Sequence, residues 1–64
     1  MNETELNDNF NTLVETTVEK LNTLKTGEPD IDVKIEETKE KILNENFKPN
    51  KVNYLTILDL NNSL

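Results

Sequence analysis

Histidine, cysteine, tryptophan, arginine and alanine are all absent from this chain of 64 residues. Histidine and cysteine are the side chains that most often bind transition metals, act as nucleophiles or transfer protons near neutral pH. Their absence excludes thiol chemistry, histidine-based catalysis and the usual structural zinc sites. Glycine occurs once, at Gly27, so there is no glycine-rich loop to bind phosphate. We therefore expect no catalytic residues, no cofactor and no metal ion, and we predict that the chain is not an enzyme.

Hydrophobic residues are also scarce. They make up 33% of the chain, below the roughly 45–50% of an average globular protein, a figure that also counts glycine. A domain of this length buries only about 60% of the surface that its unfolded chain exposes. No disulfide can compensate, because there is no cysteine. The sequence thus predicts one small domain over residues 1–64, which gains further burial by self-association or by binding a partner.

Acidic residues outnumber basic ones, with 13 Asp and Glu against 7 Lys and a net charge of -6. This sign disfavours direct binding of nucleic acid and favours a basic protein partner. No stretch is apolar over the roughly 18 residues that a membrane span needs, and residues 1–11 lack the basic and apolar regions of a secretion signal. We expect a cytoplasmic protein without membrane contact. The bias toward Asn and Lys over Ala and Arg is typical of AT-rich genes, including phage genes, and a phage protein would act in the host cytoplasm.

The first part of the chain predicts an amphipathic helix over residues 4–25. Its large hydrophobic side chains recur at steps of one, three and four residues, which places them in a helical arc of roughly 140°. They are Leu6, Phe10, Leu13, Val14, Val18, Leu21 and Leu24. Asn2 or Thr4 can cap its start. We expect Gly27 to be the residue that stops this helix.

The second segment fits two structures. Charged helix-forming residues after position 35 predict a helix over residues 31–46, with Asp30 as a candidate N-cap. However, Ile31, Val33 and Ile35 alternate with polar residues, which is a strand pattern. Pro49 ends the segment, since the residue before a proline avoids the α-helical region.

The third segment, residues 51–60, is apolar on all sides of a helical wheel, which fits either a short buried helix or a buried strand. We predict an all-α fold, a small helical hairpin or three-helix domain, in which the first two helices are antiparallel. The alternative is an α+β fold with short strands near 31–35 and 52–58.

Carboxylates are the only side chains that could support catalysis or bind a cation. Glu36, Glu37 and Glu40 form one group, and Asp30 and Asp32 form another. Their spacing does not match a calcium-binding loop, and the glutamates are interleaved with lysines. We therefore interpret them as a solvated helix face.

The apolar stripe of the first helix is the strongest functional signal. We predict a non-enzymatic protein-binding module, an inhibitor, adaptor or small regulatory subunit that occludes or bridges a partner surface. The predicted partner contacts are Leu13, Val14, Val18, Leu21, Phe47 and Tyr54. We also expect a homodimer whose buried interface contains Leu13, Val14, Val18 and Leu21. The same stripe equally fits the core of a monomer. The alternative function is an acidic mimic that blocks a DNA- or RNA-binding protein.

Overall fold

The computed structural model describes residues 2–64, and Met1 of the predicted domain lies outside them. Three helices follow in order: α1 (Glu3–Thr23), α2 (Pro29–Leu43) and α3 (Lys51–Ser63). Residues 2–64 contain no strand, so the all-α prediction is confirmed. The α+β alternative is wrong, because both candidate strands are helical. Of the three alternating residues only Ile35 is buried, whereas Ile31 and Val33 are exposed, so the alternation does not mark the buried side of a strand.

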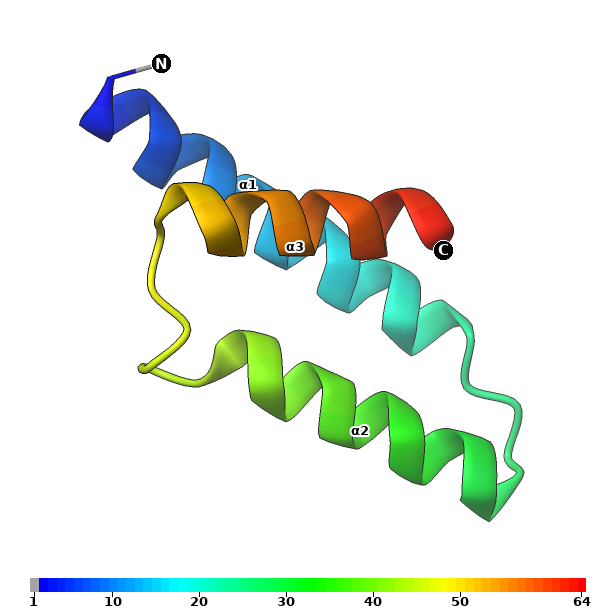
Figure 1. The fold of residues 1–64 in the computed structure, drawn as a ribbon. Coiled ribbons are helices and arrows are strands. Elements are labelled where there is room, and N and C mark those ends of the chain that lie inside the picture. Colours follow the sequence, from blue (N-terminus) through cyan, green and yellow to red (C-terminus); the bar gives the residue numbers. More distant parts are fainter. Residues whose placement is uncertain (1) are drawn as a thin grey trace.

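Helix α1 is the surface on which the other two helices pack. As predicted, α2 runs antiparallel to α1, and α3 crosses α1 on another side (Figure 1). The backbones of α2 and α3 make few close approaches to each other. The molecule is accordingly elongated, with extents of 41 × 21 × 14 Å and a radius of gyration of 12.3 Å, compared with about 11 Å for a typical compact domain of this length.

The core is formed by five buried hydrophobic residues drawn from all three helices. They are Phe10, Leu21, Ile35, Ile42 and Ile57. The segment between α2 and α3 contributes Phe47, whose ring centroid lies 5.4 Å from that of Phe10 with the ring planes inclined at 40°. This tilted aromatic contact holds the connecting segment against α1.

Two asparagines cap helix starts. The Asn2 side chain accepts a hydrogen bond from the backbone N–H of Glu5 at 2.8 Å, which decides the predicted choice between Asn2 and Thr4. The Asn50 side chain accepts from the N–H of Asn53, also at 2.8 Å, and so begins α3 directly after Pro49. Each cap satisfies an amide that the first helical turn leaves without a partner.

The predicted boundaries are wrong in all three helices: α2 ends at Leu43, well before Pro49 and not at residue 46, and α3 continues to Ser63 and not only to residue 60. Helix α1 ends at Thr23 with Leu24 as its C-cap, and Gly27 lies further along the loop, where its φ of 86° takes the left-handed conformation. Helix α2 begins at Pro29 after Glu28, so Asp30 is inside its first turn and is not the cap. Proline at the first helical position loses no hydrogen bond and presets φ, which explains the earlier start.

Thr17 occupies the middle of the buried side of α1. Its side chain is completely buried, yet its hydroxyl oxygen has no hydrogen-bond partner within residues 2–64. The residues one turn away are hydrophobic: Leu21 is in the core and Leu13 packs against it. Thr17 is therefore a polar side chain at a position where burial favours an apolar one, and its uncompensated desolvation weakens the core.

We predict that Thr17→Val stabilises the protein. Valine keeps the β-branched shape and removes the unpaired hydroxyl, so the free energy of unfolding should rise by about 1–2 kcal/mol. Urea denaturation followed by circular dichroism measures this change. Thr12→Val is the control, because the exposed Thr12 hydroxyl donates to the Asp8 carbonyl at 3.0 Å, and we expect a change below about 0.5 kcal/mol. A destabilised Thr17→Val variant would contradict this account of the core.

Candidate protein-binding surfaces

The six predicted contact residues lie together in and around the core. Leu21 is fully part of it, whereas the other five are half-buried and pack against it. Those five are Leu13, Val14, Val18, Phe47 and Tyr54. The stripe of α1 thus serves the chain's own packing in this structure, and its role as a partner contact stays a prediction.

A different set of hydrophobic side chains is exposed to solvent. Its members expose between 39% and 73% of their surface, and they are Leu24, Ile31, Val33, Leu43, Val52, Leu55 and Leu64. Only Leu24 belongs to the apolar stripe of α1. The rest belong to α2 and α3, except Leu64, which follows the end of α3.

The first apolar surface is a shallow groove of about 390 Å³, where the end of α1, the first half of α2 and the C-terminal residue converge. We call it the terminal groove. Its lining consists of Leu21, Leu24, Ile31, Lys34, Ile35, Thr38 and Leu64. Leu21 and Ile35 are core residues, and the exposed Leu24, Ile31 and Leu64 surround them. No sequence pattern indicates this groove, because only folding brings Leu64 beside α2.

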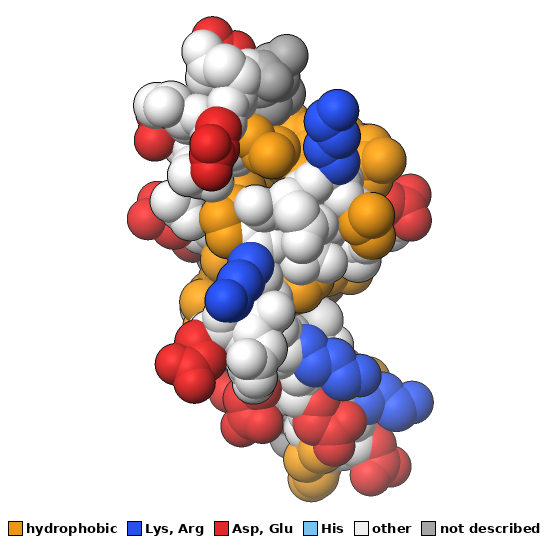
Figure 2. Space-filling view, turned by 60° about the vertical axis from the view of Figure 1, so that its left-hand side comes forward, with side chains coloured by type: hydrophobic (Ala, Val, Ile, Leu, Met, Phe, Trp, Pro, Cys, Tyr) orange, Lys and Arg blue, Asp and Glu red, His pale blue; other side chains and the backbone are white. Residues whose placement is uncertain are grey.

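The second apolar surface is the outer side of α3. We call it the α3 face and define it by Lys51, Val52, Leu55, Leu58 and Asp59. Val52 is 73% exposed and Leu55 is 63% exposed. A hollow of about 220 Å³ borders this face and is lined by Leu6, Lys51, Tyr54 and Leu55. Figure 2 shows exposed hydrophobic side chains around a lysine in its upper half, whereas lysines and acidic residues dominate its lower half.

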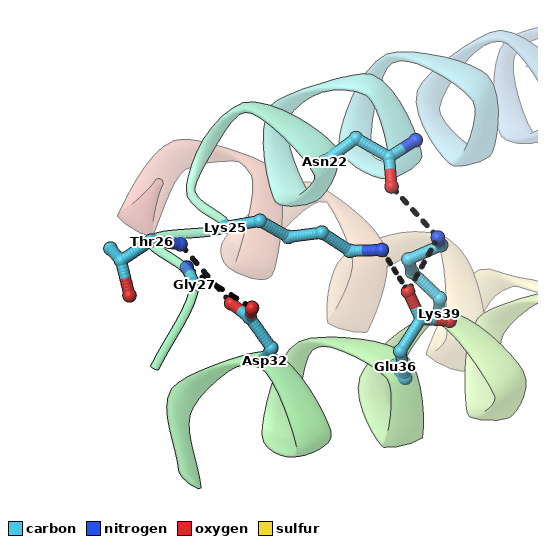
Figure 3. A network of polar contacts seen from close by, with 7 residues as sticks. All are labelled: Asn22, Lys25, Thr26, Gly27, Asp32, Glu36 and Lys39. Carbon is cyan, nitrogen blue, oxygen red and sulfur yellow. Dashed lines mark hydrogen bonds and ion pairs between the residues drawn. The ribbon is translucent and has the colours of Figure 1, made fainter. Parts of the chain in front are cut away.

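Polar contacts fix the loop beside the terminal groove (Figure 3). The two carboxylate oxygens of Asp32 accept hydrogen bonds from the backbone N–H groups of Thr26 and Gly27, each at 3.1 Å. The left-handed conformation of Gly27 belongs to the same loop. Asp32 therefore holds the loop onto the first turns of α2 and sets where Leu24 and Ile31 lie relative to each other.

A second cluster joins α1 to α2 further along the same helices (Figure 3). The Glu36 carboxylate pairs with the Lys25 ammonium and, at 3.1 Å, with that of Lys39. The Lys39 ammonium also donates to the side-chain oxygen of Asn22 at 2.7 Å. The hydrogen bond from Lys25 lowers the pKa of Glu36, and the same bond raises the pKa of Lys25. The pair is partly exposed, so solvent screens it.

We predict a pH-dependent contribution from Glu36. Because its pKa is lower in the folded chain than the ordinary 4.5, its stabilising effect is present above that ordinary value and is lost as the pH falls through the folded pKa. Thermal melts should give Glu36→Gln a lower Tm than the wild type at pH 7 and the same Tm at strongly acidic pH. The control is Glu37→Gln, which removes the same charge but no ion pair within residues 2–64. Equal Tm losses in both variants at pH 7 would contradict the proposed pairing.

Two of the five carboxylates considered for catalysis or cation binding make other contacts. Asp32 and Glu36 are engaged as described above, and Glu37, Glu40 and Asp30 are exposed. Among the described residues, no group of three or more acidic side chains could hold a metal ion. Within residues 2–64, no helix is long and apolar enough to cross a membrane.

Comparison with known proteins gives no relative from which a role could be transferred. No protein-family model, curated protein or solved structure matches the chain. The functional interpretation therefore depends on the two apolar surfaces, the polar contacts that position them and the acidic charge of the whole chain.

Proposed function

We propose that this chain is a non-enzymatic protein-binding module, an inhibitor, adaptor or small regulatory subunit that occludes or bridges surfaces of a partner. The observation that carries the proposal is the terminal groove, in which exposed hydrophobic side chains from three separate segments meet. Contiguous exposed apolar surface on a small protein is typical of interaction sites. We place its action in the cytoplasm, or in that of the host for a phage protein.

The shape and lining of the terminal groove favour a short amphipathic segment as the bound element. Leu24, Ile31 and Leu64 offer apolar contacts around a floor of core residues, which suits the apolar side of a helix. The adjoining first turn of α2 carries Asp30 and Asp32, and the chain has a net charge of -6. We therefore infer that basic residues flank the apolar contacts of the partner.

Introducing a positive charge at either of two positions on α2 tests this proposal. Ile31→Lys introduces a charge into the terminal groove, whereas Val33→Lys introduces the same charge on the same helix outside it. Both side chains are exposed, at 41% and 53%, so both variants should fold. In pull-downs from cells of the source organism, we expect one partner to be retained by the wild type and Val33→Lys. Its affinity for Ile31→Lys should fall by roughly tenfold or more.

The salt dependence of that capture separates the two candidate functions. Apolar docking should persist at high salt, because ionic screening has little effect on hydrophobic contact. Capture that is abolished by salt and unaffected by Ile31→Lys would overturn the groove proposal and favour the acidic mimic. Equal loss of binding in Ile31→Lys and Val33→Lys would also overturn it, since only the overall charge would then matter.

A further inference from the structure

Helix α3 presents a pattern that is symmetric about Leu55. Its only charged residues are Lys51 and Asp59, which lie four positions before and four positions after Leu55. Two hydrophobic residues, Val52 and Leu58, lie three positions before and three after it. The order of charged and hydrophobic positions along the α3 face is thus the same in both directions of the chain. The two charges differ in sign, positive at Lys51 and negative at Asp59.

All members of this pattern are accessible on the same side of the helix. At about 100° per residue they fall within an arc of roughly 120° centred on Leu55. Lys51, Val52, Leu55 and Asp59 are exposed, and Leu58 is half-buried. Neither the Lys51 ammonium nor the Asp59 carboxylate forms an ion pair anywhere in residues 2–64. The fold of a single chain therefore leaves most of this face exposed.

We propose that the α3 face binds the α3 face of a second copy, with the two helices antiparallel and a two-fold axis passing beside Leu55. Lys51 and Asp59 lie about 6 Å from Leu55 along the helix axis, in opposite directions and on opposite sides. A two-fold axis that lies between the helices, perpendicular to both and level with Leu55, brings Asp59 of the second copy to the level of Lys51, where the two side chains can meet across the seam. The same rotation places Leu58 of the second copy at the level of Val52 along the helix, on the other edge of the interface.

In the proposed dimer, the second copy covers the α3 face. Each dimer forms two Lys51–Asp59 ion pairs and buries Val52 and Leu55 of both chains. The hollow lined by Leu6 and Tyr54 borders the face, so the apolar contact extends from α3 onto α1. Such an interface is self-complementary and closes after two copies. It shares no residue with the terminal groove, so the inference does not rest on the proposed function.

Sedimentation equilibrium on single-site variants tests the dimer. We expect the wild type to dimerise, and Leu55→Glu to weaken dimerisation by roughly tenfold or more, because it places two carboxylates beside the axis. Circular dichroism should show that Leu55→Glu, at a position 63% exposed in the monomer, keeps its helices. Val33→Glu, at a similarly exposed position on α2, is the control and should dimerise as the wild type does. A monomeric wild type, or a dimer unaffected by Leu55→Glu, would overturn the proposal.

Charge exchange tests the antiparallel arrangement itself. Lys51→Asp and Asp59→Lys should each weaken the dimer, since each single variant sets like charges against each other at both ends. The double variant Lys51→Asp/Asp59→Lys recreates both ion pairs with their signs exchanged, and its dimer affinity should recover. Single variants that do not weaken the dimer, or a double variant no better than the singles, would contradict this register.

Cross-linking at the two-fold axis gives an independent readout, because the natural chain has no cysteine. In the proposed dimer, the residues at position 55 of the two chains lie close together. Leu55→Cys should therefore form a disulfide-linked dimer under mild oxidation. Val33→Cys lies away from the axis and should cross-link at least about tenfold more slowly, at the rate of random collision. Equal rates for the two variants would overturn the assignment of Leu55 to the axis.

Discussion

The packing of α2 and α3 on α1, with few close approaches of their backbones to each other, is the constraint from which the rest of the structure follows. Phe10, Thr17 and Leu21 are the buried residues of α1, and Phe10 and Leu21 share one core with Ile35, Ile42 and Ile57. A third helix that packed on both others would have closed the core. Here α2 and α3 instead each keep one side open, and that is where the exposed hydrophobic residues lie.

Polar contacts determine how one of these open sides is shaped. The loop between α1 and α2 is held by the Asp32 carboxylate, while Glu36 connects Lys25 of the loop region to α2. At the other helix, the Lys20 ammonium donates to the backbone carbonyl of Asn61 at 3.1 Å and so holds the end of α3 against α1. These contacts bring Leu64, Leu24 and Ile31 to one groove. They are partly exposed, so their effect is to position the segments more than to stabilise them.

The fold was predictable where the hydrophobic residues of a helix all lie on one side of it. The α1 stripe has a single buried side, so its period of 3.6 residues was clear, and Asn2 acts as a cap through chemistry visible in the sequence. Helix α3 showed no period because its hydrophobic residues serve two surfaces at once. Ile57 points into the core, whereas Val52 and Leu55 point outward. Hydrophobic residues on all sides of α3 left its secondary structure ambiguous in the sequence, and the same distribution suggests an interface.

Loop geometry and the terminal groove were beyond sequence reasoning for a physical reason. The boundaries near Gly27 depend on where the Asp32 carboxylate finds backbone amides, which is a tertiary contact five and six residues away. The groove needs Leu64 beside Ile31, and no local pattern relates the two. The four predicted contact residues on α1 lie in the core or pack against it, and their role as partner contacts stays a prediction.

The central claim is that burial left incomplete in one chain is completed between two copies. The most direct test is the thermal unfolding midpoint of the wild type as a function of its concentration. If unfolding and dissociation are coupled, mass action predicts that Tm rises by roughly 5–10 °C for a hundredfold increase in concentration. A sharp transition whose midpoint stays the same over that range would contradict the claim and show that one chain is stable alone.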